Sequence, residues 1–349
     1  MPPSGLARRL PEWWYQPGLA LPLWPLLPLS WLFGALVALR RGAYRWHLLP
    51  SYRLPVPVIV VGNLTVGGSG KTPLVLWLVE RFRQAGWQPG IISRGYASGK
   101  SEIRPVLAMD KAATVGDEPL LLARRAGVAV FVGRDRVAAG RALLAAHPQC
   151  DLLLSDDGLQ HYRLQRAAEV VLFDGRGAGN GRLLPAGPLR EPLRRLRTVT
   201  AVVRNGQSPA LRRIPVPPVL PQFAMSLVGR RFVAVTDCQR HCDADALRGR
   251  RLYAIAGIGD PSRFFRQLTD LGLEFAAQPF PDHHRYEEGE LDFAHDGVLL
   301  MTEKDAVKCA TIVAGEAWFL PVRAEIGASA GCSDLFETLL ETLHGRPSA

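Results

Sequence analysis

Short β-branched runs along this chain alternate with longer amphipathic stretches. Apolar runs that end in glycine or polar residues predict buried strands, and stretches with a helical period predict helices. We expect strands at 58–61, 88–93, 128–132, 150–154, 169–173, 200–203, 251–256 and 298–301, and helices at about 74–85, 120–126, 137–146 and 262–271. This alternation predicts an α/β fold with a parallel sheet that has helices on both faces.

The N-terminal region follows a different pattern. Residues 13–39 contain no charged side chain, and Arg40, Arg41 and Arg45 follow at once. Prolines interrupt the first half, so a helix is expected only at about 30–46. A cleaved signal peptide, a spanning helix, an interfacial anchor and a helix buried in the protein's own core all fit an apolar stretch of this length. We favour the interfacial anchor, with its tryptophans at headgroup depth and its arginines at anionic lipid.

A glycine-rich turn joins the first strand of the sheet to the next helix. It contains Gly67, Gly68 and Gly70 and ends in Lys71 and Thr72. Strand, loop and helix in this order form the context of a phosphate-binding loop, in which glycines let backbone N–H groups approach a polyphosphate. The alternative is an ordinary strand-to-helix turn. The expected nucleotide-binding residues are Thr65, Val66, Gly67, Gly68, Ser69, Gly70, Lys71 and Thr72, with the Thr72 hydroxyl on Mg²⁺ and with Thr65 where the pattern has glycine.

Carboxylates lie at two further positions that matter in such a fold. Asp117 and Glu118 begin a helix, so they either cap it or act as a catalytic base and a metal-linked acid. Asp156 and Asp157 end an apolar strand, as the residues that hold Mg²⁺ in phosphate-loop enzymes do. His161, close by in sequence, is a candidate to orient or share a proton with a base.

The formal charge of +10 comes almost wholly from arginine. It suits an acidic partner such as nucleic acid, anionic lipid or a phosphorylated substrate, or it reflects a GC-rich genome. Arg190, Arg194, Arg195 and Arg197 either bind a substrate phosphate, lie on a membrane or are merely solvated. The five scattered cysteines lack a second ligand pair and indicate reduced thiols rather than a zinc site.

Seven motifs, in order, resemble one known family, the tetraacyldisaccharide 4′-kinases of lipid A biosynthesis. The resemblance covers nearly the whole chain. The motifs are Val-Gly-Asn-Leu-Thr-Val-Gly-Gly-Ser-Gly-Lys-Thr-Pro (61–73), Ser-Arg-Gly-Tyr (93–96), Gly-Asp-Glu-Pro (116–119), Asp-Asp-Gly-Leu-Gln-His (156–161), Leu-Leu-Pro-Ala-Gly-Pro-Leu-Arg-Glu (183–191), Phe-Pro-Asp-His-His-Arg-Tyr (280–286) and Thr-Glu-Lys-Asp-Ala-Val-Lys (302–308).

The resemblance implies a kinase that transfers the γ-phosphate of ATP, with Mg²⁺, to the 4′-hydroxyl of tetraacyldisaccharide 1-phosphate. It implies a monotopic enzyme on the cytoplasmic face of the bacterial inner membrane. Asp117 would be the base and His283 or His284 its helper, a choice that the sequence leaves open. Family members have Thr or Ser at the position of Thr65, so that departure from the usual loop belongs to the family.

These observations also predict site residues, partners and the organisation of the chain. Metal ligands are expected among Thr72, Asp156, Asp157 and Glu118, and substrate contacts at Arg94, Arg190 and Asn63. We expect a monomer that does not bind nucleic acid. The rival interpretation is a nucleotide hydrolase that drives a protein partner, such as a metallochaperone-type GTPase. The expected segments are a membrane anchor (1–50), the kinase domain (51–210), a linker and β-ribbon (211–235) and a C-terminal α/β domain closing the nucleotide cleft (236–349).

Overall fold

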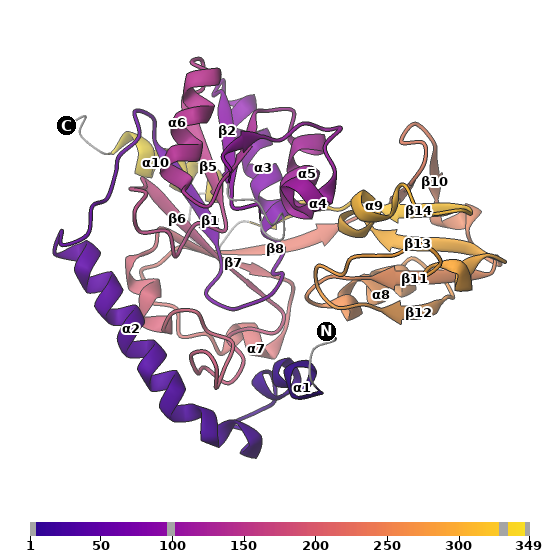
Figure 1. Ribbon diagram of the computed structural model, residues 1–349, viewed down its shortest axis with the longest axis horizontal. Helices are drawn as coiled ribbons and strands as arrows, with labels where there is room; N and C mark the ends of the chain where they lie inside the picture. The colour runs from indigo at the N-terminus through magenta and orange to yellow at the C-terminus, as the bar shows by residue number, and fades with distance from the viewer. Residues whose placement is uncertain (1–4, 96–101, 328–333, 346–349) are drawn as a thin grey trace. The chain divides into compact units, whose positions relative to one another are not determined.

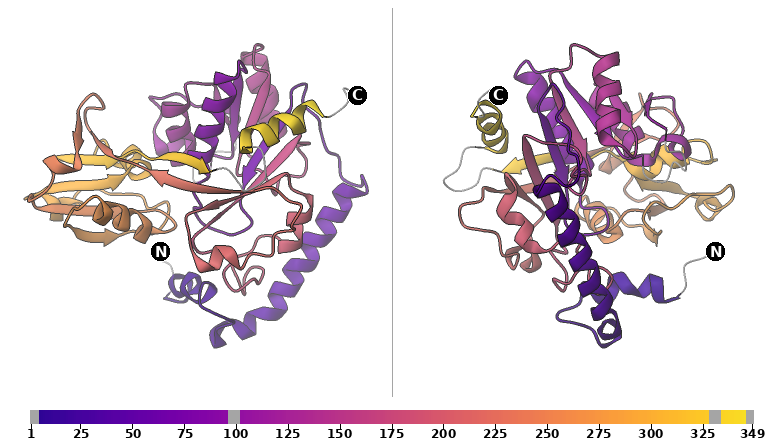
Figure 2. Two further views of the ribbon diagram at one scale, coloured as in Figure 1. Left: turned by 180° about the vertical axis from the view of Figure 1, so that it is seen from behind. Right: turned by 60° about the vertical axis from the view of Figure 1, so that its left-hand side comes forward.

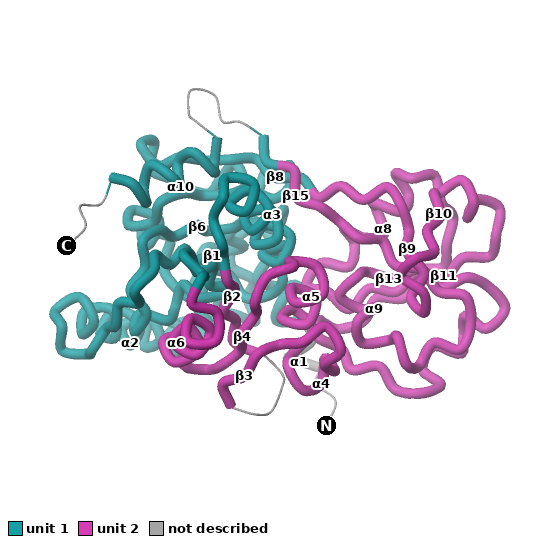
Figure 3. The backbone as a smooth tube through the Cα atoms, turned by 90° about the horizontal axis from the view of Figure 1, so that it is seen from above, with its two compact units in different colours: residues 1–89, 149–226, 326–349 teal, residues 90–148, 227–325 magenta. Residues whose placement is uncertain are grey.

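The computed structural model describes residues 5–95, 102–327 and 334–345. The chain forms two compact units, one of residues 1–89, 149–226 and 326–349 and the other of residues 90–148 and 227–325 (Figure 3). We call them unit 1 and unit 2. The sequence had predicted four consecutive segments, whereas these units interleave along the chain. Interleaving arises because contacts, not chain order, define a unit: in unit 2, α5 (Asp117–Ala126) packs against α9 (Glu303–Cys309).

Unit 1 is built on parallel strands around β1 (Val58–Gly62) (Figure 1). β1 pairs with β5 on one side, with Val61 opposite Asp156, and with β6 on the other. β7 pairs with β6, and β8 with β7, again in parallel. All side chains of β1, β5 and β6 are buried, as expected of central parallel strands. The bounds of the other strands are β5 (Leu152–Asp156), β6 (Ala168–Asp174), β7 (Ala201–Asn205) and β8 (Gln222–Val228).

The position of β8 corrects one expectation. Residues 211–235 were predicted to form a linker and β-ribbon, and β9 (Arg231–Ala234), at the end of this range, does pair in the six-stranded sheet of unit 2. Gln222 to Met225, however, lie in parallel register with Val202 to Asn205. The alternating pattern indicated a strand, but periodicity does not reveal which strand is the neighbour.

The helices of unit 1 pack on and around these strands. α3 (Lys71–Gln84) is the next helix after β1 along the chain, and α10 (Leu335–His344) packs against α3 (Figure 2). Phe82 and Phe336 meet edge to face with their ring centroids 5.0 Å apart. The short helices are η2 (Leu193–Thr198) and α7 (Pro209–Arg212).

The N-terminal region of unit 1 contains three helices. They are α1 (Gly5–Trp14), η1 (Leu21–Leu26) and α2 (Leu27–Arg45). Pro28 falls in the first turn of α2, where proline has no N–H bond to lose. Residues Leu21–Arg45 are long and apolar enough to cross a membrane, judged by length and composition alone. The sequence pattern gave no sign of α1.

Unit 2 contains a six-stranded sheet in the order β10-β9-β14-β13-β11-β12. Within the same unit, β4 pairs in parallel with β2 and antiparallel with β3. The predicted mixed α/β fold with a parallel sheet is confirmed. The strands and helices not yet given are β2 (Pro89–Ser93), β3 (Arg104–Pro105), β4 (Val130–Val132), β10 (His241–Asp243), β11 (Leu252–Ala256), β12 (Ala276–Pro279), β13 (Val298–Thr302), β14 (Ala317–Leu320), β15 (Arg323–Gly327), α4 (Ala112–Val115), α6 (Arg136–Ala146), α8 (Pro261–Asp270), η3 (Ala244–Ala246) and η4 (Asp292–Ala294).

Candidate active site

The glycine-rich loop connects β1 to α3, as the sequence predicted. Gly67 and Gly70 adopt left-handed backbone angles, with φ of 94° and 93°. A Cβ on Gly70 would lie 2.5 Å from the Asn205 side chain, so only glycine fits there. α3 begins at Lys71, and both Lys71 and Thr72 are buried. The loop therefore presents a helix N-terminus with a lysine and a hydroxyl in its first turn.

Four consecutive carbonyl groups of the loop are held by side chains from elsewhere in unit 1. A carbonyl and the N–H of the same peptide unit point in opposite directions. Donors on the carbonyls therefore turn the amide hydrogens the other way, toward the space in which an anion can bind. The pairs are Tyr15 Oη to Val66 O (3.5 Å), Asn63 Nδ2 to Gly67 O (3.0 Å), Arg176 Nη2 to Gly68 O (3.0 Å) and Asn205 Nδ2 to Ser69 O (2.9 Å).

Thr65 lies in a short antiparallel bridge opposite Leu189. Flanking backbone bonds join Val66 N to Pro188 O (2.9 Å) and Arg190 N to Leu64 O (2.7 Å). Extended backbone of this kind suits any L-residue, and Thr65 does not have a positive φ. This explains physically why threonine replaces the usual glycine. It also ties the loop to the Leu-Leu-Pro-Ala-Gly-Pro-Leu-Arg-Glu segment.

Lys71 lies among polar groups at the edge of the loop. Its Nζ is 3.4 Å from Asn63 Oδ1 and 3.6 Å from Asp157 Oδ1. Arg190 Nη1 lies 3.0 Å from the same Asp157 oxygen. Asp157 has a positive φ of 51°, which a non-glycine residue rarely adopts. Two predicted substrate residues, Asn63 and Arg190, thus lie beside Lys71 and Asp157.

The residues predicted to hold Mg²⁺ in unit 1 suit that ion chemically. The register of β1 and β5 places Asp156 opposite Val61, one residue before the end of β1. Asp156 is 1% exposed, and Thr72 lies in the first turn of α3. Carboxylate and hydroxyl oxygens are the hard ligands that Mg²⁺ prefers. Among the residues that the structure describes, no group of three or more His, Cys, Asp or Glu side chains forms a metal site, so the remaining ligands would be phosphate oxygens and water.

A second polar cluster lies in unit 2, at the start of α5. Asp117 is 6% exposed and follows Gly116, whose φ is 95°. His283 Nδ1 lies 3.0 Å from Asp117 Oδ2 and 3.1 Å from Oδ1. Of the two histidines that the sequence left as alternatives, His283 is therefore the one in contact with Asp117. His284 instead contacts Glu290, with 2.9 Å between His284 Nε2 and the carboxylate oxygens.

Lys304, from α9, is shared by this cluster. Its Nζ lies 3.1 Å from Glu118 Oε1, 3.1 Å from Asp282 Oδ1 and 3.8 Å from Asp117 Oδ2. The same Nζ is 3.5 Å from His283 Nε2. Glu118, expected as a metal ligand, is therefore engaged by a lysine. With Lys304 donating to Nε2, a neutral His283 carries its proton on Nδ1 and donates it to Asp117.

These contacts determine the charge states in the cluster. Burial raises the pKa of Asp117, but the hydrogen bond from His283 and the charge of Lys304 outweigh it and hold that pKa below its ordinary value. Burial lowers the pKa of His283, but the bond to Asp117 raises it above its ordinary value. Burial likewise lowers the pKa of Lys304, and the nearby carboxylates, led by Glu118, raise it. Asp117 is therefore an anion at neutral pH, ready to accept a proton.

Other predicted residues are described by contacts or exposure of their own. The carbonyl of His161 accepts a bond from Arg166, which gives that residue a role in shaping its loop. Arg94 follows β2 directly and is exposed, and Tyr96 of its motif lies outside the described residues. Cys150, Cys238, Cys242 and Cys309 are free thiols, and Cys332 also lies outside the described residues.

Sequence reasoning missed the donors that hold the loop. Arg176 and Asn205 lie at or just after the ends of β6 and β7, so polar residues at strand ends were the available signal. Tyr15 carried no signal, because it reaches the loop only through the tertiary fold. Lys304 entered the sequence analysis only as part of the motif at 302–308, and the structure places its Nζ among carboxylates of unit 2.

Replacement of His283 by glutamine is expected to lower the melting temperature most between about pH 3.8 and 6.5, and little in alkaline solution. The pKa of His283 is raised in the folded protein. Its contribution to stability is therefore complete below the pKa of the unfolded state and is lost as pH rises through the pKa of the folded state. The pKa of Asp117 is lowered in the folded protein. Its contribution to stability is therefore complete above the pKa of the unfolded state and is lost as pH falls through the pKa of the folded state. Thermal unfolding of the variant across pH measures this, with exposed His295→Gln as control. A pH-independent difference would contradict the ion-pair assignment.

Comparisons with known proteins identify the family. A model of the family described as Tetraacyldisaccharide-1-P 4′-kinase matches residues 22–341. The tetraacyldisaccharide 4′-kinase of Dechloromonas aromatica is 54% identical over 346 residues, which cover 99% of this chain and 100% of that one. Its counterpart in Azoarcus sp. is 55% identical over 97% of both chains.

A solved structure supports the same assignment. The crystal structure of LpxK from Aquifex aeolicus, described as an "apo" form in complex with ATP, superimposes with a TM-score of 0.76 at 29% identity. The match covers 93% of this chain and 100% of that one. The phosphate-loop geometry, the Asp117–His283 pair and these similarities agree, and the chain belongs to the tetraacyldisaccharide-1-P 4′-kinase family.

Proposed function

We propose that the loop of unit 1 and the Asp117 cluster of unit 2 carry out the reaction that names the family. ATP is the phosphate donor, and the 4′-hydroxyl of a tetraacylated glucosamine disaccharide 1-phosphate is the acceptor. The observation that carries this proposal is a phosphate loop in which four consecutive carbonyls accept hydrogen bonds from side chains. A loop preorganised in this way stabilises charge that develops on phosphate oxygens without reorganising during the reaction.

Lys71 and the loop amides bind the β- and γ-phosphates in this mechanism. Lys71 contacts Asn63 and Asp157 at 3.4 and 3.6 Å, distances long enough for its ammonium to turn readily to a phosphate. When Lys71 turns from Asp157 to a phosphate, Arg190 still neutralises the Asp157 carboxylate. Thr72 with Asp156 or Asp157 would hold Mg²⁺, which supplies charge neutralisation at the β- and γ-phosphates.

Asp117 is the proposed base for the acceptor hydroxyl. Its lowered pKa keeps the carboxylate ionised at neutral pH, so it can accept the proton of the hydroxyl as that oxygen attacks the γ-phosphate. His283 holds the carboxylate through Nδ1, and Lys304 holds the other side of the imidazole. His283 and Lys304 are positioning residues, and Glu118 and Asp282 complete the ion network. Arg94, Arg190 and Asn63 remain predicted substrate contacts.

The N-terminal helices are proposed to hold the enzyme on the cytoplasmic face of the inner membrane, where both ATP and the lipid acceptor are available. Large apolar side chains on and near α2 are exposed: Leu21, Trp24, Leu29, Trp31, Leu32, Leu36, Leu39, Trp46 and Leu48. Exposed apolar surface of this extent on one segment is costly in water and indicates contact with lipid. Monotopic attachment and a monomeric state stay predictions.

One assay tests the proposed function. The protein is incubated with γ-labelled ATP, Mg²⁺ and the disaccharide 1-phosphate in detergent, and the lipid products are separated. We expect label in a bis-phosphorylated lipid that depends on the acceptor. ATP hydrolysis at the same rate without lipid would instead favour the nucleotide hydrolase that the comparisons do not support.

The anchor is tested by removing its apolar surface. The triple variant Trp31→Ser, Leu32→Ser, Leu36→Ser is expected to shift the protein from the membrane fraction to the soluble fraction, because burial of each such side chain is worth about 2 kcal/mol. The readout is partition between sedimented membranes and supernatant. Three serines at exposed Leu107, Met109 and Val219, outside the N-terminal helices, form the matched control. Equal partition of the two variants would refute the anchor.

A further inference from the structure

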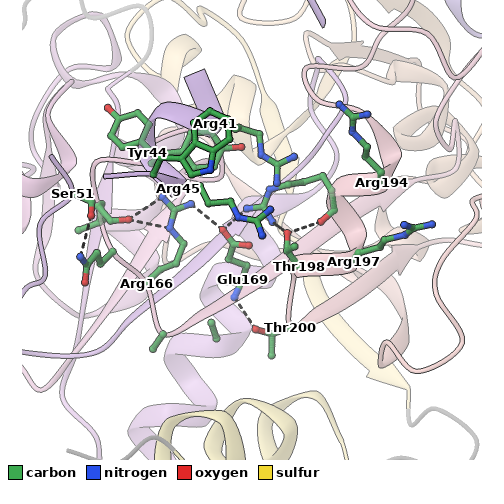
Figure 4. A pocket seen from close by; sticks show the side chains of 18 of the residues that line it. Arg41, Tyr44, Arg45, Ser51, Arg166, Glu169, Arg194, Arg197, Thr198 and Thr200 are labelled. Atoms are coloured by element: carbon green, nitrogen blue, oxygen red, sulfur yellow. Dashed lines mark hydrogen bonds and ion pairs between the residues drawn. The ribbon is translucent and has the colours of Figure 1, made fainter. Parts of the chain in front are cut away.

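A cavity of about 930 Å³ lies in unit 1, where the C-terminal end of α2 meets the start of β6 and η2 (Figure 4). Its charged lining consists of six arginines and a single carboxylate, which is an unusual excess of positive charge for one cavity. These charged residues are Arg41, Arg45, Arg166, Arg194, Arg195, Arg197 and Glu169. The nucleotide site uses none of them.

The floor of the cavity is a hydrogen-bonded network of Arg166, Arg195 and Glu169, and Arg195 also pairs with Glu191 at 3.3 Å. Glu169 accepts bonds from Arg195 Nη2 at 2.5 Å and from Arg166 Nη1 at 2.9 Å. Arg195 is 3% exposed and also binds Thr198 Oγ1 at 2.6 Å. Two arginines thus share the one carboxylate of the lining, and hydrogen bonds hold both guanidinium groups in place.

The rim carries the unbalanced charge. Arg45, Arg194 and Arg197 are exposed, and Arg41 is half-buried, with its guanidinium 5.9 Å from the ring centre of Tyr162. Among the residues that the structure describes, these four have no carboxylate within ion-pair distance. Like charges gathered around one cavity repel one another, and a bound anion removes that repulsion. Guanidinium groups bind phosphate oxygens in pairs, so a phosphate is the anion that this set fits best.

The cavity is remote from the nucleotide loop. β6 runs from Ala168, in the cavity lining, to Asp174, which pairs with the Arg176 that holds Gly68. At about 3.3 Å per residue this strand is roughly 20 Å long. A phosphate in the cavity therefore cannot be one of the phosphates that the loop binds.

Apolar side chains in and near the lining identify the kind of phosphate. Trp46 lines the cavity and is 69% exposed, and Leu39 and Leu48, each within two residues of a lining residue in the sequence, are 68% and 73% exposed. A free phosphate ion would leave this apolar surface exposed to water. A phospholipid suits both the arginines and the apolar side chains, because its phosphate headgroup binds the arginines while its acyl chains cover Trp46 and the leucines.

We propose that this cavity is a binding site for the phosphate headgroup of an anionic phospholipid of the membrane. The site would select anionic lipid and hold the C-terminal end of α2 at the membrane surface. This proposal rests on the membrane attachment of α2 proposed above and is independent of the catalytic assignments.

The test measures partition of the full-length protein onto vesicles of phosphatidylcholine alone and of phosphatidylcholine with phosphatidylglycerol. The variants are the doubles Arg194→Gln/Arg197→Gln and Arg194→Lys/Arg197→Lys. The matched control is Arg83→Gln/Arg230→Gln, which removes the same charge from exposed positions elsewhere. The melting temperature of each variant and its kinase activity in neutral detergent establish that the variant is folded. We expect the activity to stay within about twofold of the parent.

We expect the glutamine double to lose about tenfold or more in partition onto phosphatidylglycerol vesicles, and the control about twofold or less. The lysine double should lose about threefold, because lysine keeps the charge but not the paired hydrogen bonds. Partition onto phosphatidylcholine alone should not change, and its loss would implicate the anchor instead. The proposal is overturned if the glutamine double partitions onto phosphatidylglycerol vesicles as well as the control does, or if the lysine double partitions as well as the parent. It is also overturned if millimolar inorganic phosphate releases the parent protein from these vesicles as effectively as it releases the glutamine double.

Discussion

Replacement of Lys71 by methionine is expected to lower kcat about 10³-fold with little change in folding. Methionine keeps most of the apolar stem and removes the ammonium, which in our mechanism stabilises charge that grows on the transferring phosphate. Loss of a single preorganised donor of this kind costs two to three orders of magnitude in other enzymes. The measurement is single-turnover transfer of labelled phosphate at saturating ATP.

Lys111→Met is the matched control, because Lys111 is exposed and precedes α4. Its kcat should match that of the parent. The Lys71 variant also leaves Asp157 paired with Arg190, so its melting temperature should stay close to the parent value. A Lys71→Met enzyme with at least a tenth of the parent kcat would show that the loop does not bind the reacting phosphates.

Replacement of Asp117 by asparagine is expected to lower kcat about 10³-fold while the affinity for ATP stays within about twofold. Asparagine has nearly the same shape but cannot accept the hydroxyl proton, and general-base catalysis contributes roughly 10²- to 10⁴-fold. Transfer to the lipid and equilibrium binding of a nucleotide are measured on the same preparation. A kcat loss with unchanged nucleotide affinity is the signature of a base.

Two further variants sharpen this test. Asp270→Asn, at the exposed end of α8, is the control for the loss of a carboxylate in unit 2. His283→Gln should lose about tenfold, and its combination with Asp117→Asn should be little worse than Asp117→Asn alone, since a positioning residue has no effect without the group it positions. Full additivity of the two losses would contradict the coupling seen in the 3.0 Å contact.

Much of the fold was predictable because the signals are local. The β-branched run before Gly62, the glycines at 67 and 70 and the apolar period after Lys71 predicted β1, the loop and α3. Prediction failed where a contact partner decides the result. The residues of β8 were assigned to a linker and β-ribbon, because the residues of a strand do not indicate which strand it pairs with.

The candidate site divides in the same way. The sequence alone determined which residue types were available: a lysine and a threonine after a glycine loop, two aspartates after a strand, and carboxylates at a helix start. These depend on neighbours within a few positions, so local pattern was enough. The matching motifs also identified the family.

Only the tertiary structure decided which of these groups meet. It paired Asp117 with His283 rather than His284, because the loop before Tyr286 turns the first histidine toward α5 and the second toward Glu290. It also brought α2 and η2 to one arginine-lined cavity although about 150 residues separate them along the chain. Contacts over such separations depend on how the whole chain packs, which no local pattern encodes.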